Sequence, residues 1–291
     1  MTGTMKGTTK GTGVPPEAMP ENMDSEITEK TKEEETGGQM TFFEHLIELR
    51  KRIINSLIAI VVCALGGWFL APKFVDIFAK PILAALKAHG YTQQLIYTDP
   101  TDYLGLLIKL SIYIGLVISS PVVLYQVWMF VAPALYKHER SAVTGFVFST
   151  VILFLGGIAF GFFVALPHIL GFLVGFQGPK SAVTPMIHIK DYFDLALLVI
   201  VALGLVFELP VLIFLLCYFG IVTPKFLVQN TKYAVLAITI VAAIVTPTPD
   251  ALTMLLVMGV MLALYFLGVG VAWIALRNRA KQTAATATQG A

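Results

Sequence analysis

The chain has 291 residues, of which 57% are hydrophobic and only 13% are charged, and its formal net charge is +2. Soluble domains carry about 25% charged residues, so this composition excludes a soluble globular protein and indicates a polytopic membrane protein. The basic residues lie mainly between apolar runs, so we interpret them as topological signals and expect no nucleic-acid binding.

The first 39 residues are rich in Thr, Gly, Glu and Met and include the acidic run Glu33 to Glu35. Their apolar content is too low to offset the entropy lost on ordering, so we predict a disordered cytoplasmic tail over 1–39. Thr41 and Glu44 match a capping box, which predicts a helix start. This helix is expected to approach along the cytoplasmic membrane surface and to run into the first span.

Six runs rich in Leu, Ile, Val, Ala and Phe follow. They are continuous rather than alternating, so they predict helices and not strands of an outer-membrane barrel. A membrane-spanning helix needs about 20 mostly apolar residues. The predicted spans are at about 53–71, 103–122, 143–166, 193–219, 233–245 and 252–276.

The distribution of Lys and Arg predicts the orientation of these spans. An even number of spans places both termini on one side, which then carries fourteen Lys and Arg residues against five on the other. Without the four cations of the tail the ratio is still ten to five. By the positive-inside rule, both termini are expected to be cytoplasmic.

The segment 72–98, after the first span, is too polar to cross the membrane and has apolar residues at helical spacing. It predicts two short amphipathic helices on the outer face, hinged at Pro81. Lys109 lies about 10 Å along the second span from Tyr103, close enough to the outer boundary for its long side chain to reach water. Residues 167–190 are predicted to form a second outer loop, in which His168 and His188 lack the third ligand of a metal site.

Glu208 is the deepest acidic residue, about 21 Å into the fourth span. An ionised carboxylate near the bilayer centre costs at least ~2.5 kcal/mol, so this side chain must be neutral, paired or in a polar cavity. Pro210 cannot donate a hydrogen bond to the carbonyl of Val206. Two interpretations stay open: a neutral glutamic acid that holds helices together, or a functional group on a hydrated or partner-facing surface.

The fifth span has only about thirteen apolar residues, or about 20 Å of helix against a ~30 Å hydrocarbon core. We expect either a thinned membrane or partner helices here, and hence a concave wall on one side of the bundle. Thr223-Pro224 and Thr248-Pro249 each combine a cap residue with proline and predict helix starts. Residues 280–291 are small and polar and are predicted to be a disordered tail.

An amphipathic stretch from Gln126 to Arg140, QVWMFVAPALYKHER, separates the second and third spans. It ends in a cluster of charges at the predicted cytoplasmic boundary. From the residues alone, Glu139 either pairs with the neighbouring Lys137 or Arg140, or binds a positive charge on a partner. Glu48 likewise either pairs with Arg52 on its own helix, which contributes about 0.2 to 0.5 kcal/mol, or binds a partner.

Several motifs resemble the TatC family, the receptor subunits of the twin-arginine translocase. They are HLIELRKR at 45–52, the run ending in APALYKHER at 132–140, FELPV at 207–211 and a TP-containing turn that ends at Asp250. The resemblance covers about 40–277. It implies an all-α integral membrane protein with six transmembrane helices in a concave, cup-like bundle, formed here by 40–279.

The resemblance implies a Sec-independent protein translocase subunit in the cytoplasmic (inner) membrane and no enzyme activity or cofactor. Such a subunit binds twin-arginine signal peptides at the cytoplasmic face. With the single-span TatA and TatB subunits it exports folded proteins, driven by the proton-motive force. The implied partners are therefore these subunits, signal peptides of folded cargo, membrane lipid and further copies of the chain in a receptor complex.

Family positions also imply roles for individual residues. Glu48 and Glu139 correspond to the carboxylates that bind the paired arginines. The glutamate corresponding to Glu208, followed by Pro210, faces a concave membrane surface and is linked to TatA or TatB contact or to deep signal insertion. Pro81 and Asp250 correspond to outer-face structural positions. The other implied signal-peptide contacts are Arg50, Gln126, Phe130 and His138.

Two other classes fit the sequence less well. A solute transporter is expected to have inverted repeats and several intramembrane charges at broken helices, whereas this sequence has one deep acid and no obvious repeat. An intramembrane enzyme needs a nucleophile and base, or metal ligands, at spanning depth, and no such motif lies there. Both cysteines, Cys63 and Cys217, fall inside apolar runs and are interpreted as small core residues.

Overall fold

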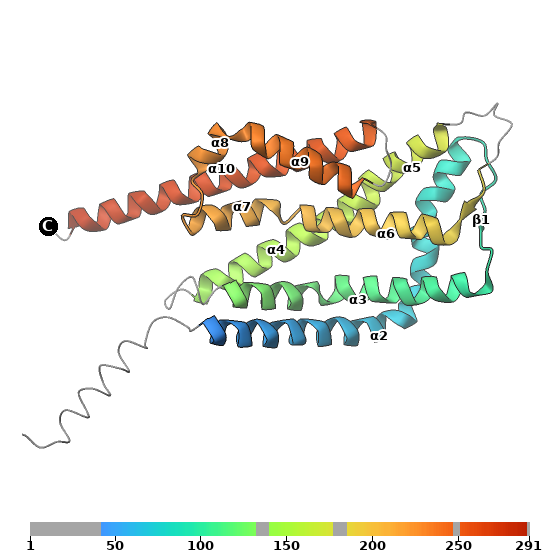
Figure 1. Cartoon of the computed structure of the whole chain (residues 1–291), viewed down its shortest axis with the longest axis horizontal. Coiled ribbons are helices and arrows are strands. Elements are labelled where there is room, and N and C mark those ends of the chain that lie inside the picture. The colour runs from blue at the N-terminus through green and yellow to red at the C-terminus, as the bar shows by residue number, and fades with distance from the viewer. Residues whose placement is uncertain (1–41, 132–139, 177–184, 247–250, 290–291) are drawn as a thin grey trace, which may run out of the picture. The chain divides into compact units, whose positions relative to one another are not determined.

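The computed structural model describes residues 42–131, 140–176, 185–246 and 251–289 (Figure 1). The chain divides into two units, Met1–Glu48 and Leu49–Ala291, and the arrangement described below is that of the second unit. The elements are α2 (Phe42–Ala88), β1 (Leu95–Ile96), α3 (Pro100–Val131), α4 (Arg140–Phe160), the π-helix η2 (Gly161–Ala165), α5 (Leu166–Gly175), β2 (Ile187–His188), α6 (Ile189–Val206), α7 (Leu209–Tyr218), α8 (Pro224–Gln229), α9 (Thr231–Val245) and α10 (Ala251–Gln289).

Five helical segments of the described chain are long and apolar enough to cross a membrane: His45–Ala88, Pro100–Phe130, Gly145–Gly175, Ile189–Tyr218 and Thr253–Arg277. They confirm a mostly helical membrane protein. The fifth predicted span corresponds to α9, an apolar helix of only 15 residues. At 1.5 Å per residue α9 is about 22 Å long, shorter than a ~30 Å hydrocarbon core, as its composition predicts.

Helix α2 differs from the prediction of a span followed by two separate short helices. It continues to Ala88 with Pro72 and Pro81 inside it, and Figure 1 shows that its later, cyan part turns away from its earlier part. A proline removes one backbone hydrogen bond and bends a helix, but it need not end it. Here the helix continues because Val75, between the two prolines, and Ile82 and Leu86, beyond Pro81, are buried in the core.

The third span also continues past its predicted end. The helix passes from α4 through η2 into α5 and ends at Gly175, so Pro167 lies in the first turn of α5 and not in a loop. A proline removes one backbone hydrogen bond but need not end a helix, and the π-helical turn η2 directly precedes Pro167 here. Towards the other end of the chain, α10 runs on to Gln289, through most of the segment predicted to be a disordered tail.

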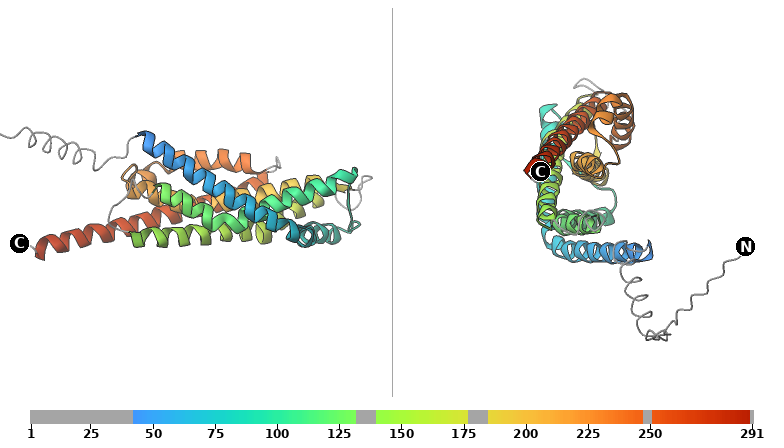
Figure 2. Two further views of the ribbon diagram at one scale, coloured as in Figure 1. Left: turned by 90° about the horizontal axis from the view of Figure 1, so that it is seen from below. Right: turned by 90° about the vertical axis from the view of Figure 1, so that its left-hand side faces the viewer.

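Two groups of buried side chains form the core of the unit 49–291, whose helices Figure 2 shows running broadly along one direction. The first group joins the later part of α2 to α3, α5 and the start of α6, and includes Leu110 and Phe193. The second joins the end of α6 to α7, α9 and α10, and includes Leu203 and Met261. Helix α6 thus belongs to both groups and is packed along its whole length.

Two short elements confirm or extend the sequence analysis. Thr223 caps α8 as predicted, because its side-chain oxygen accepts a hydrogen bond from the N–H of Phe226 at 3.2 Å. The strands β1 and β2 form a parallel pair with Leu95 opposite Ile187 and Ile96 opposite His188. The sequence gives no signal for this pair, since each strand is only two residues long.

Helices α2 and α3 approach closely at a glycine. A Cβ atom on Gly67 would lie 2.8 Å from the backbone oxygen of Ser111 and 3.2 Å from Ile114 Cγ2, whereas a Cβ atom on the adjacent Gly66 would meet nothing within 4 Å. Small residues at helix crossings allow such close backbone contacts in membranes. Gly67 therefore sets the distance between α2 and α3.

Replacement of Gly67 by Ala is expected to push α2 and α3 apart and to destabilise the protein by about 1 to 3 kcal/mol, the usual cost of overpacking. The thermal denaturation midpoint of the purified protein in detergent measures this effect. The matched control is Gly66→Ala, which should leave the midpoint unchanged or slightly higher. Equal midpoints for the two variants would contradict the predicted contact.

Candidate functional site

The end of α3 is joined to α2 by a hydrogen bond between side chains 74 positions apart. Arg52 Nη1 on α2 donates to Gln126 Oε1 on α3 at 3.0 Å, in partly buried surroundings. A guanidinium group has five donors in a fixed planar arrangement, and one of them is used on this amide oxygen. This contact joins Arg52, the last residue of the HLIELRKR motif, to Gln126, the first residue of the QVWMF stretch of α3.

An aromatic row continues from this end of α3 to two further helices. Trp128 is 7% exposed, and its Nε1 donates to Thr150 Oγ1 of α4 at 3.1 Å. The Trp128 ring stacks on Phe146 with centroids 5.3 Å apart, and Phe146 lies 5.2 Å from Phe214 of α7. Trp128 and Thr150 thus fix α3 against α4, a role that the sequence alone did not reveal because the two residues lie on different predicted spans.

The remaining predicted signal-peptide contacts are placed as follows. Glu48 is partly buried on the first turns of α2, Arg50 is exposed, and Phe130 is partly buried near the end of α3. Glu139 and His138 lie outside the described residues, between the end of α3 and the start of α4, and Asp250 also lies outside them. The structure therefore joins Gln126 to Arg52. The position of Glu139 relative to Glu48 lies outside the described residues.

Glu208 lies at an interruption of the fourth span. Helix α6 ends at Val206 and α7 begins at Leu209, with Phe207 and Glu208 in a turn between them. The Glu208 carbonyl still accepts a hydrogen bond from the N–H of Leu212 at 2.9 Å. Because Pro210 has no N–H, the carbonyl of Val206 loses its usual partner, and this loss explains the break.

Neighbouring helices hold this interruption in place. Pro210 is buried against α10, where a Cβ atom on Gly268 would lie only 2.8 Å from Pro210 Cα. The ring of Phe207 contacts that of Phe160 on α4, with centroids 5.6 Å apart. Oxygen Oε1 of Glu208 is buried and has no hydrogen bond to any residue that the structure describes. The Glu208 side chain is thus held between helices, and one of its oxygens has no hydrogen-bond partner among the described residues.

Pro81, the predicted outer-face residue, lies near a contact between α2 and α6. The Tyr192 hydroxyl donates to the carbonyl oxygen of Phe78, one turn before Pro81. Tyr192 is 3% exposed, and the ring of Phe78 stacks on that of Phe193 of α6 with centroids 6.4 Å apart. The bent part of α2 is therefore fixed to α6 by both a hydrogen bond and aromatic packing.

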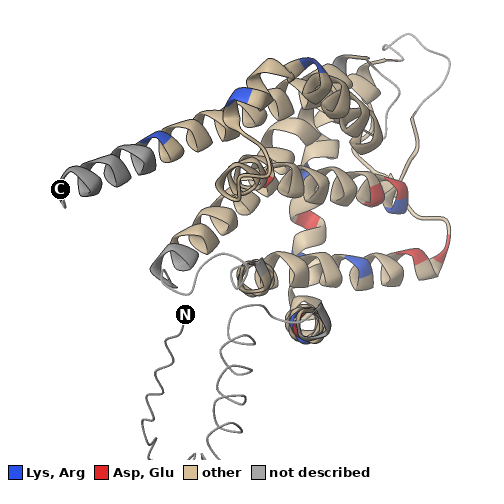
Figure 3. Cartoon of the chain, turned by 60° about the vertical axis from the view of Figure 1, so that its left-hand side comes forward, with Lys and Arg blue, Asp and Glu red and all other residues tan. Residues whose placement is uncertain are grey.

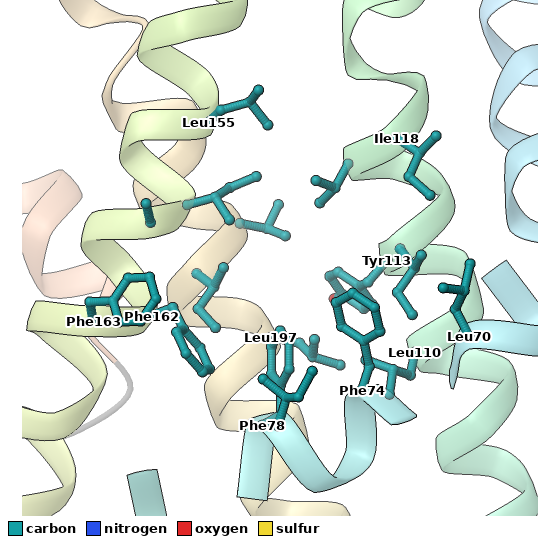
Figure 4. Close-up of a pocket in the computed structure, with 17 residues that line it drawn as sticks. Leu70, Phe74, Phe78, Leu110, Tyr113, Ile118, Leu155, Phe162, Phe163 and Leu197 are labelled. Carbon is teal, nitrogen blue, oxygen red and sulfur yellow. The ribbon is translucent and has the colours of Figure 1, made fainter. Parts of the chain in front are cut away.

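A cavity of about 370 Å³ lies between α2, α3, α4 with η2, and α6. Figure 4 shows Phe74 and Phe78 of α2, Ile118 of α3 and Phe162 of η2 around a common space. Its lining contains no charged side chain. Guanidinium groups need carboxylates or other acceptors, so this cavity does not recognise arginine.

Lys109, predicted to extend towards water, instead forms an ion pair with Asp194 of α6. The two residues are 85 positions apart, so no local pattern in the sequence connects them. Among the described residues, no three His, Cys, Asp or Glu side chains are grouped as ligands of a metal ion.

The chain is similar to known proteins along most of its length. Residues 44–259 match the family described as "Sec-independent protein translocase protein (TatC)". A TatC protein of Koribacter versatilis (strain Ellin345) is 41% identical over 268 residues, which cover 92% of this chain and 97% of that protein. A TatC protein of Escherichia coli (strain K12) is 38% identical and covers 77% of this chain and 85% of that protein.

Solved structures agree with this result. A crystal structure of the twin-arginine translocase receptor TatC superposes with a TM-score of 0.70 at 35% identity, covering 80% of this chain and all of that one. Both the family match and the identities extend over the α2, α3 and α6–α7 motifs described above. The chain therefore belongs to the TatC family of Sec-independent protein translocase proteins.

Proposed function

We propose that this chain is the receptor that binds twin-arginine signal peptides at the cytoplasmic face of the inner membrane. With TatA- and TatB-type partners it exports folded proteins, using the proton-motive force. The observation that carries this proposal is the match to TatC proteins over 44–259, which includes the motifs that contain Glu48 and Glu139. The family consists of membrane transport proteins, which agrees with a receptor and not with a catalyst.

In this proposal the binding groups are the carboxylates of Glu48 and Glu139. A carboxylate pairs with a guanidinium group through two parallel hydrogen bonds, whereas lysine offers a single point charge. Two carboxylates on separate segments therefore bind two adjacent arginines more tightly than two lysines. Arg50, Gln126, Phe130 and His138 complete the proposed contact surface around them.

The contact between Arg52 and Gln126 supports this location. It joins α2 to α3, and in the sequence Glu48 lies four residues before Arg52 and Glu139 lies thirteen residues after Gln126, immediately before α4. A receptor gains affinity when its binding elements are held in place before the peptide arrives, because less entropy is then lost on binding. We infer that the Arg52–Gln126 bond and the Trp128–Thr150 bond provide this support.

The topology that we infer has six spans with both termini cytoplasmic. In it α9 is the fifth and shortest span, and its mismatch with the bilayer contributes to a concave side of the bundle. The excess of Lys and Arg on the side of the termini supports the orientation. Glu208 then lies within the membrane on this concave side, where a partner helix or the inserted signal can contact it, while Pro81 and Asp250 act at the outer face.

Replacement of Glu48 or Glu139 by Gln is expected to weaken binding of a twin-arginine peptide by about tenfold or more, because each loses a charge-assisted pair with one arginine. Binding of a fluorescent peptide to the purified protein measures the change. Asp76→Asn removes an exposed carboxylate elsewhere on α2 and is the control that should bind normally. A peptide with two lysines should bind weakly to the wild type, and equal binding of the arginine peptide to all variants would refute the assignment.

Replacement of Glu208 by Leu separates stability from function. An apolar group at this position removes a buried oxygen that has no partner, so the thermal midpoint should stay the same or rise. Export of a twin-arginine reporter should fall strongly, since the proposed contact with partner or signal is lost. A large drop in the midpoint would indicate a structural role for Glu208 instead, and normal export by a stable variant would exclude the proposed role.

A further inference from the structure

A cavity of about 320 Å³ lies between the first turns of α3 and α6 and has no part in the proposed peptide site. We call it the α3–α6 charge pocket. Figure 3 shows acidic and basic residues together on these helix ends, near the connections to β1 and β2. The lining residues are Thr101, Asp102, Gly105, Leu106, Lys109, Lys190 and Asp194.

The ion pair in this pocket lies inside two apolar spans. Lys109 follows Pro100 by nine residues and Asp194 follows Ile189 by five, or about 14 Å and 7.5 Å of helix. Their side chains are 42% and 44% exposed. On the surface of a membrane span the exposed side faces lipid, and hydrocarbon next to charged groups is unfavourable. A polar group from outside these two helices is therefore needed to cover this pair, and a phospholipid headgroup is one that the membrane itself supplies.

The pocket offers hydrogen-bonding groups of both signs. Lys109 has three donors and uses one on Asp194, and Lys190 is exposed at the rim. Asp102 Oδ2 accepts the N–H of Asp99 at 3.3 Å, which leaves its other oxygen for a ligand. The lysines match a phosphate and the aspartates match an ammonium group. A purely anionic headgroup would leave the two carboxylates facing a like charge.

Apolar side chains continue from the pocket towards the middle of the membrane. Ile112 lies one turn beyond Lys109 on the same face of α3, and Leu198 lies one turn beyond Asp194 on the same face of α6. They are 51% and 48% exposed. Charged groups followed by an exposed apolar strip match the two parts of a phospholipid, its headgroup and its acyl chains.

We propose that the α3–α6 charge pocket binds one zwitterionic phospholipid of the leaflet on the β1–β2 side, which is the outer leaflet in the inferred orientation. The phosphate contacts Lys109 and Lys190, and the headgroup amine contacts Asp102 and Asp194. The acyl chains lie along Ile112 and Leu198. The bound lipid covers the ion pair that joins α3 to α6 and so completes the packing of these helices.

The test uses the full-length protein, stripped of lipid in detergent and then given equal amounts of phosphatidylethanolamine and phosphatidylglycerol. Native mass spectrometry counts the lipids that stay bound. The wild type should retain phosphatidylethanolamine about tenfold better than phosphatidylglycerol, because only the former satisfies both lysines and both aspartates. Equal retention, or a preference for phosphatidylglycerol, would overturn the proposal, as would retention of neither lipid.

The double variant Asp102→Asn with Lys190→Ala leaves the Lys109–Asp194 ion pair intact. In this variant the ratio of retained phosphatidylethanolamine to phosphatidylglycerol should fall about tenfold. Asp76→Asn with Lys80→Ala is the matched control, since it removes one anion and one cation from exposed positions on α2 and should retain the lipid as the wild type does. Unchanged preference in the first variant would exclude the pocket as the binding site. Should that variant fold poorly, as judged by circular dichroism, the wild-type competition alone still decides.

Discussion

The absence of water in the hydrocarbon core governs this structure, because polar groups there must be satisfied by the protein or by lipid. The Lys109–Asp194 pair meets this demand between α3 and α6, near the start of both helices. Glu208 meets it only in part, since one of its oxygens is buried without a hydrogen bond to any described residue. A buried oxygen without a hydrogen bond destabilises the fold, and this cost supports the proposed contact of Glu208 with a partner helix or the inserted signal.

Much of the architecture follows from the sequence for the same reason. Long apolar runs in a membrane protein have no alternative to helix or barrel, so their position and type could be predicted, and the short length of α9 could be predicted from its composition. The predicted helix ends differ from the observed ones mainly at prolines. Pro72, Pro81 and Pro167 look like helix ends, but each lies inside or at the start of a packed helix whose neighbours compensate for the lost hydrogen bond.

Some site residues could be identified from the sequence, whereas their contact partners could not. Charged residues in the family motifs, such as Glu48 and Glu208, could be selected from the sequence, because a charge at or within the membrane is rare and costly. Their partners could not, because which residue faces which across two helices depends on helix rotation and crossing. The pairs Arg52–Gln126, Trp128–Thr150 and Lys109–Asp194 join different spans and are visible only in three dimensions.

The parallel pairing of β1 with β2 has a consequence for the order in which the chain assembles. Leu95 pairs with Ile187, so this connection cannot form until the ribosome has made two further spans, Pro100–Phe130 and Gly145–Gly175. Contacts between residues so distant in sequence form late because a long loop must close first. The α2–α3 hairpin is thus synthesised early, whereas β2 is made only after α5 and directly before α6, so α2 and α3 must pack together without this pairing until then.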